Sequence, residues 1–155
     1  GFTTGVTKAE INSIYTAKGE FHAHELVHLV LDEVNSKQHF LVEEGIAEFL
    51  GSKKQNLGKY QKERQMLLHN LANNPDYSIS AILEGKMAFN GYNYKYAFGA
   101  AVVELIYRKE GIEGLKSLLE SDTNSNQAYL SAVRTILHYE SIQELKTQLA
   151  ELTDG

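Results

Sequence analysis

A single proline in 155 residues is the feature that most limits how this chain can fold. Proline interrupts helices, and Pro75 lies in Asn73-Asn74-Pro75-Asp76, a typical break between two of them. Elsewhere apolar residues recur at a spacing of three or four, which predicts a mainly α fold, α+β at most. We expect helices over residues 20–34, 40–53, 57–72, 78–84, 95–110, 112–120, 125–138 and 142–151.

One N-terminal segment favours extended structure. Residues 10–16 are enriched in β-branched and aromatic residues, so we predict a short edge strand there. Thr7, followed three residues later by Glu10, has the spacing of a capping box and could open a short helix instead. The two alternatives remain open from the sequence.

The start of the helix predicted over 95–110 is also ambiguous. Asn90-Gly91 stands between an apolar and a tyrosine-rich stretch, a composition compatible with a tight hairpin. Helical spacing continues from Ala97 to Tyr107, however. We therefore predict a loop that enters the helix near Asn93. The last helix has a clearer start, because Ser141 and Glu144 form a capping box.

Length and composition indicate one globular domain, residues 1–155, with 43% apolar and 23% charged residues. No run of eighteen apolar residues is present, so we expect no membrane span. The lack of cysteine excludes disulfides and thiolate metal sites. A net charge of −5 argues against nucleic acid as a partner. One basic stretch is predicted to be the solvated side of a helix: Lys53, Lys54, Lys59, Lys62 and Arg64.

The helix predicted over 20–34 contains the segment His24-Glu25-Leu26-Val27-His28. With 3.6 residues per turn, the two histidines lie one above the other on one face. Their imidazoles can then bind a single ion at roughly 2.0–2.1 Å. Glu25 is rotated by about 100° from His24, beside such an ion, where it can accept a proton from water.

A second acidic pair occurs in the next predicted helix. Glu44 and Glu48 are four residues apart, so their side chains share a face. One of these carboxylates can bind a metal ion, and the other can hydrogen-bond the distal nitrogen of a histidine ligand. The two segments together predict a metal site of nitrogen and oxygen ligands, a set that suits zinc.

These residues resemble a known family. His24-Glu25-x-x-His28 followed by Glu44-Gly45-x-Ala47-Glu48 is similar to the gluzincin metallopeptidases, the superfamily of thermolysin and aminopeptidase N, and more narrowly to the peptidase MA-like domains. The match covers residues 21–50, and a weaker one covers 96–111. The resemblance implies a compact zincin-like domain with a metal-binding helix, short edge strands and a C-terminal helical bundle, as one piece of a longer chain.

The resemblance also implies roles for single residues. His24, His28 and Glu44 would bind one zinc ion, Glu25 would be the general base, and Glu48 would orient a histidine ligand. Tyr96 occupies the family's tyrosine-led position and is the expected oxyanion donor, with Tyr92 and Tyr94 as alternatives. The function implied is zinc-dependent hydrolysis of peptide bonds in a peptide or protein substrate. Many such domains act outside the cytoplasm, and the oligomeric state stays open.

Other interpretations compete with this one. Residues 1–23 lack the Gly-x-Met-Glu-Asn segment of aminopeptidases, so that specificity is not implied. A non-catalytic peptide-binding or scaffold module would keep a structural metal, closed by a fourth ligand such as His39. His39 could equally cap the next helix. Chance would leave two inert histidines beside an acidic helix face. We predict that the remaining histidines, His22, His69 and His138, lie on the surface. Some gluzincins use a distant histidine as the oxyanion donor, so His69 and His138 stay open as alternatives for that role.

Overall fold

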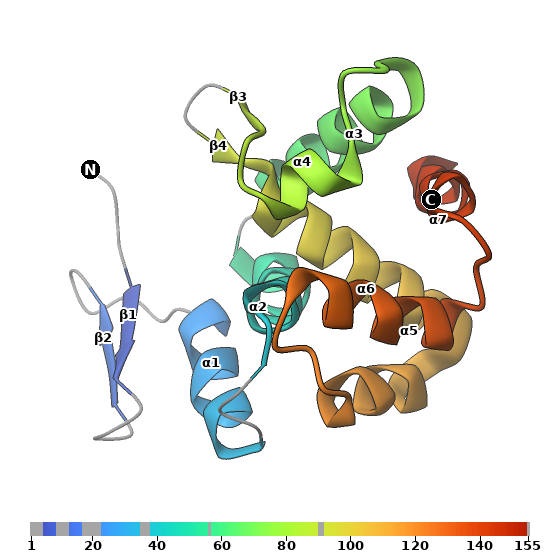
Figure 1. The fold of residues 1–155 in the computed structure, drawn as a ribbon. Helices are drawn as coiled ribbons and strands as arrows, with labels where there is room; N and C mark the ends of the chain where they lie inside the picture. Colours follow the sequence, from blue (N-terminus) through green and yellow to red (C-terminus); the bar gives the residue numbers. More distant parts are fainter. Residues whose placement is uncertain are drawn as a thin grey trace.

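The computed structural model describes residues 5–8, 13–16, 23–34, 38–55, 57–89 and 92–154. The fold is mainly helical, as predicted (Figure 1). The helices are α1 (Ala23–Val34), α2 (Phe40–Gln55), α3 (Leu57–Asn73), α4 (Ile79–Leu83), α5 (Tyr94–Glu120), α6 (Asn126–Leu137) and α7 (Ile142–Ala150), followed by a 3₁₀ turn, η3 (Glu151–Asp154). The strands are β1 (Gly5–Lys8), β2 (Ser13–Thr16), β3 (Ala88–Phe89) and β4 (Tyr92–Asn93).

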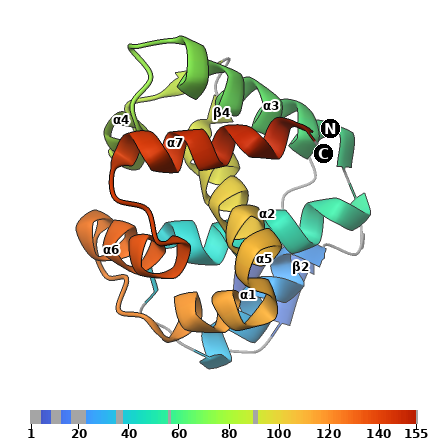
Figure 2. The ribbon, with the colours of Figure 1, turned by 90° about the vertical axis from the view of Figure 1, so that its right-hand side faces the viewer.

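The long helix α5 organises the molecule. It packs against α2, α3, α4, α6 and α7, and α1 packs on α2. Figure 2 shows α7 lying across α5 and beside α3. Because the inward faces of these helices are apolar, they enclose one core, which includes Leu41, Phe49, Phe98, Val102, Ile106, Leu118 and Tyr129. None of the described helices combines the length and the apolar composition needed to cross a membrane.

Most predicted helices begin and end within three residues of the observed ones. The two helices predicted over 95–110 and 112–120 both lie within α5 and meet at Gly111, where φ is 63° and ψ is −151°, which is not helical. The predicted break between them is therefore present. Glycine adopts positive φ at little cost, so the chain turns there without strain. The predicted cap of the last helix is confirmed, because Ser141 Oγ accepts a hydrogen bond from the amide of Glu144 at 3.2 Å.

The N-terminal strands form an antiparallel ribbon in which Val6 lies opposite Tyr15. Strand β2 lies inside the segment predicted as a strand, and residues 10–12 lie outside the described residues. Thr7 belongs to β1, so it does not open a helix. Both strands contact α1, at the edge of the molecule where α1 lies (Figure 1).

The prediction of a loop before α5 is wrong. Strands β3 and β4 pair antiparallel, with Phe89 opposite Tyr92, and α5 begins at Tyr94. The local turn preference of Asn90-Gly91 is consistent with this hairpin, and residues 90–91 themselves lie outside the described residues. The predicted start of the helix near Asn93 is confirmed, because α5 begins at Tyr94.

The prediction that Arg64 is solvated is also wrong. Arg64 is buried on α3, where its Nη1 donates to Glu104 Oε2 on α5. Arg108, one turn after Glu104, donates to the other carboxylate oxygen from Nη2 at 2.7 Å and from Nε at 3.1 Å. Lys62 is exposed on the same helix, as predicted, and the side chains of Lys53, Lys54 and Lys59 lie outside the described residues. A buried ion pair thus joins α3 to α5.

Helices α2 and α5 touch through their backbones at a pair of glycines. A Cβ atom on Gly45 would lie 2.7 Å from the carbonyl carbon of Gly99, and one on Gly99 would lie 2.8 Å from the carbonyl oxygen of Leu41. Neither distance leaves room for a side chain. The close approach fixes how α5 lies on α2, and so brings the residue before Gly45, Glu44, near the first turn of α5.

Candidate metal centre

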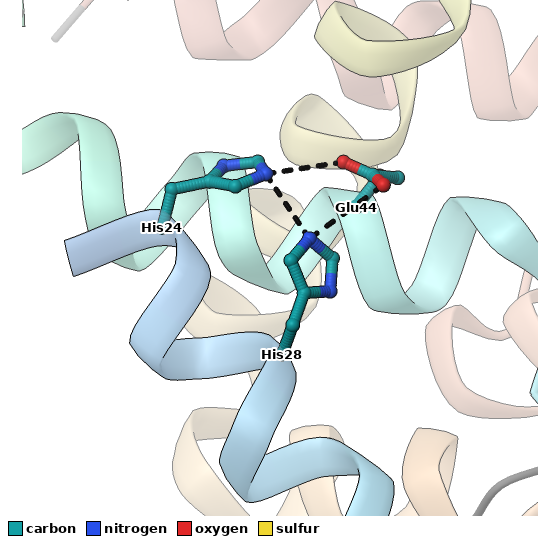
Figure 3. A group of neighbouring side chains, drawn as sticks. All are labelled: His24, His28 and Glu44. Carbon is teal, nitrogen blue, oxygen red and sulfur yellow. Dashed lines mark hydrogen bonds and ion pairs between the residues drawn. The ribbon is translucent and has the colours of Figure 1, made fainter. Parts of the chain in front are cut away.

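Three potential metal ligands converge between α1 and α2 (Figure 3). His24 Nε2 lies 3.2 Å from Glu44 Oε2, and His28 Nε2 lies 3.6 Å from Glu44 Oε1. The two Nε2 atoms lie 3.1 Å apart. The histidines share one face of α1 because they are four residues apart, and that face is turned toward α2. The structure therefore brings together the three residues that the sequence predicted as ligands.

The three separations suit a small divalent ion. Ligands held at about 2.0–2.1 Å in a tetrahedral arrangement are roughly 3.3 Å from one another. The two Nε2 atoms, 3.1 Å apart, lie close to that value. Glu44 meets the imidazoles with different oxygens, at 3.2 and 3.6 Å, and one ligand atom from each of the three residues lies within 4.8 Å of the other two. The three side chains are only 17–24% exposed, so they are partly shielded without being sealed from solvent. Two imidazole nitrogens and one carboxylate are also a donor set that zinc accepts.

The electrostatics of the cluster favour positive charge. Burial, the largest single influence, lowers the pKa of His28, but its interaction with Glu44 and the charges of nearby glutamates outweigh burial and raise that pKa. Burial likewise raises the pKa of Glu44, but the interactions with His24 and His28 are stronger in sum and lower it to about 2. Glu44 is therefore ionised at neutral pH, as a metal ligand must be.

Two further glutamates flank the cluster. Glu48 Oε1 lies 3.7 Å from His24 Nδ1, the nitrogen that does not face Glu44. This distance is longer than a hydrogen bond but places the carboxylate on the side of the ring where it can orient the imidazole. Glu25 follows His24 on α1 and is close enough for its charge to raise the pKa of His28. Both carboxylates are thus near the histidines, and their expected roles stay predictions.

Tyr96, in the first turn of α5, is close enough to the cluster to respond to its charges. Burial raises the pKa of Tyr96, and the charges of Glu44 and Glu48 raise it further, so the phenol is neutral and can donate a hydrogen bond. Its ring contacts that of Phe40 edge to face, with ring centres 5.3 Å apart. Phe40 is exposed, and sequence reasoning did not single it out, although it lies one turn before Glu44 on the same face.

The two alternative tyrosines have different outcomes. Tyr94 is buried, with its ring centre 5.9 Å from that of Tyr77 and its hydroxyl 3.5 Å from Asn70 Nδ2. These contacts are with α3 and the segment before α4, so Tyr94 packs in the core. The side chain of Tyr92 lies outside the described residues.

The other histidines among the described residues, His39, His69 and His138, do not join the cluster. His39 Nδ1 accepts a hydrogen bond from the amide of Leu41 at 3.2 Å, and its Nε2 lies 2.9 Å from Asn126 Oδ1. His39 therefore caps α2, which is one of its two predicted roles. His69 is exposed on α3, and His138 ends α6 with a φ of 54°. His22 lies outside the described residues.

Sequence reasoning missed one member of the electrostatic surroundings. The charge of Glu43 also raises the pKa of His28, although Glu43 is outside the family motif. Its position next to Glu44 was the only signal available in the sequence.

Comparison of the chain with models of protein families, with curated proteins and with solved structures found no match. The geometry of the cluster is therefore the main basis for assigning a function.

Proposed function

We propose that this chain is a zinc-dependent peptidase domain that hydrolyses peptide bonds in a peptide or protein substrate. One observation carries the proposal. Two imidazole nitrogens and a carboxylate from neighbouring helices converge, with one ligand atom from each residue within 4.8 Å of the others. The two nitrogens are 3.1 Å apart, close to the spacing of ligands around one tetrahedral ion. The glutamate expected to act as base immediately follows the first histidine. The donor set supports zinc as the ion.

Each residue of the cluster has a role in this proposal. His24, His28 and Glu44 would hold the ion. Zinc bound there would polarise a substrate carbonyl and lower the pKa of water. Glu25 takes a proton from the attacking water and delivers it to the leaving amine. The ring of His24 is oriented by Glu48.

Tyr96 would donate its hydroxyl hydrogen to the oxyanion that develops on the substrate. Its neutral phenol and its nearness to Glu44 support this role. We further propose that the fold is zincin-like. In that arrangement α1 is the metal-binding helix, and the β1–β2 ribbon that contacts it provides an edge for an extended substrate.

The alternative in which the metal is structural has less support. A structural site is closed by a fourth protein ligand. The residue considered for that place, His39, uses both ring nitrogens elsewhere. Among the described residues, the metal-binding group consists of His24, His28 and Glu44 alone. A base such as Glu25 would also have no task in a structural site.

The decisive experiment replaces the base and keeps the ligands. Glu25→Gln should bind one zinc ion as the unchanged protein does, yet lose peptide hydrolysis by several orders of magnitude. Glu113→Gln is a matched control, because Glu113 is exposed on α5, where it pairs with Lys116 on the surface. Its activity should be unchanged. Full turnover by Glu25→Gln would contradict the proposed function.

A further inference from the structure

We propose that Gly51 is a positioning residue for His24. Because Gly51 has no side chain, α2 can contact the backbone at the start of α1, and this contact sets where the first imidazole stands relative to Glu44. The inference rests on the metal centre of the proposed function but not on hydrolysis. Gly51 lies outside the family motif and outside the cluster itself.

The space around Gly51 leaves no room for a methyl group. A Cβ atom there would lie 2.7 Å from both the Cα and the backbone nitrogen of His24, and 3.0 Å from its Cβ. Ordinary contacts begin at 3.4 Å. The two closest atoms belong to backbone, so no rotamer change relieves the overlap. The first turn of α1 would have to move by several tenths of an ångström.

A movement of that size matters for a metal ligand. Distances in a metal site are held to within about 0.2 Å. Glu44 and Gly51 are seven residues apart on α2, about two turns of one rigid helix. The contact therefore fixes the backbone of His24 on the same element that carries Glu44. Its Nε2 then stands 3.2 Å from the carboxylate.

A substitution at Gly51 can disturb the contact with His24 without disturbing the core. Gly45, also on α2, meets Gly99 in the α2–α5 interface, where a side chain would separate two core helices. Gly51 instead meets α1, which packs on α2 at the edge of the molecule (Figure 1). Leu26 and Val30 on α1 are exposed, so the outer face of this helix is free of core packing. Alanine also favours a helix interior more than glycine does. A Gly51→Ala chain is therefore expected to fold.

The experiment measures metal binding by the full chain without any substrate. Co²⁺ and Zn²⁺ affinities are determined by competition for the unchanged protein, Gly51→Ala and Gly114→Ala, and thermal unfolding is followed for the metal-free proteins. Gly114→Ala is the matched control, because a Cβ there would lie 2.5 Å from Glu110 Cβ within α5 itself. It introduces a comparable overlap away from His24.

Gly51→Ala should weaken Co²⁺ and Zn²⁺ binding by about 10- to 100-fold, as changes to residues that orient ligands do. The visible spectrum of bound Co²⁺ should change, while the metal-free variant unfolds cooperatively. Gly114→Ala should alter unfolding and keep the affinity. Unchanged affinity and spectrum in Gly51→Ala would overturn the inference. So would a chain that does not fold, since the contact would then serve the fold and not the site.

These outcomes separate the inference from the proposed function. If the unchanged protein binds no metal, the proposed metal centre fails, and the inference fails with it. If the unchanged protein binds metal and hydrolyses no peptide, only the peptidase proposal fails. The effect of Gly51→Ala on affinity would then still assign its positioning role.

Discussion

Two clusters of charged and polar side chains lie within this helical domain, and they are built on opposite principles. Around Glu104, each carboxylate oxygen meets a guanidinium, one from Arg64 and one from Arg108. Around Glu44, the two imidazole nitrogens lie 3.1 Å from each other, and both also face the carboxylate. In the first cluster the carboxylate meets two groups that are always positively charged. In the second it meets two imidazoles whose nitrogens also face each other, an arrangement that a bound cation would satisfy.

The two clusters also differ in how far their side chains are exposed to solvent. The side chains of Arg64 and Glu104 are 5% and 8% exposed, whereas those of His24 and Glu44 are 24% and 18% exposed. The buried pair of Arg64 and Glu104 holds α3 and α5 together, and its charges are not accessible to a ligand. A partly open cluster with an excess of acid is arranged to accept one. The sign of the charges and their access to solvent, more than the number of ionisable groups, distinguish a structural pair from a candidate site.

The largest effect on stability should come from the cluster around Glu104. Glu104→Ala leaves the guanidinium of Arg64 buried without this carboxylate, which typically costs about 3–5 kcal/mol. Chemical unfolding should show this loss, while Zn²⁺ affinity stays the same. Exposed Glu113→Ala serves as the control and should change the free energy of unfolding by less than about 1 kcal/mol. A fall in metal affinity for folded Glu104→Ala would contradict the separation of the two clusters.

The open cluster should show the reverse behaviour. His28→Ala removes one of three ligands, and a zinc site worth roughly 10–16 kcal/mol over four ligands loses about a hundredfold to a thousandfold in affinity. The metal-free protein should unfold nearly as before, because His28 is only partly buried. Isothermal titration with Zn²⁺ measures the loss. His69→Ala, at an exposed histidine on α3, should bind as the unchanged protein does.

Removing the hydroxyl of Tyr96 should lower the rate of hydrolysis without changing the affinity for zinc. Tyr96→Phe keeps the ring that contacts Phe40 and removes the hydroxyl, so kcat for a peptide substrate should fall roughly a hundredfold or more. Zinc affinity should stay constant, because Tyr96 is not a ligand in the proposal. Tyr107→Phe, at an exposed tyrosine on the same helix, is the control. Equal loss in both variants would remove Tyr96 from the chemistry.

The sequence predicted the features that depend on local spacing. A separation of four residues places His24 and His28 on one face of any α-helix, and Ser141 caps a helix by the same local logic. The packing of α1 against α2, which turns this face toward Glu44, belongs to the tertiary structure. The sequence indicated it only through the resemblance to a family.

Contacts between distant segments explain why Arg64 and Gly51 were missed, whereas the hairpin error was local. Arg64 looked solvated because its partner, Glu104, lies 40 residues further along the chain. The β3–β4 hairpin was missed because the helical spacing after Ala97 outweighed a two-residue turn signal. Gly51 gave no signal at all, since a close approach of backbones depends on how two helices cross. Such contacts are seen in the packing of the folded chain and are not predicted by the spacing of residues in the sequence.

The smallest effect is expected at Glu48, and it tests whether this carboxylate orients the ring of His24 in the open cluster. Glu48→Gln keeps the size of the side chain and removes the charge that lies 3.7 Å from His24 Nδ1. Orienting carboxylates of this kind contribute about 10- to 100-fold to metal affinity. Zinc competition at constant pH should show a loss in that range, smaller than that of His28→Ala, with unchanged metal-free unfolding. Glu43→Gln is the control on the same helix, because Glu43 acts on His28 through its charge. A similar loss in both variants would mean that Glu48 acts only through the negative charge that surrounds the cluster, and not by holding the ring of His24.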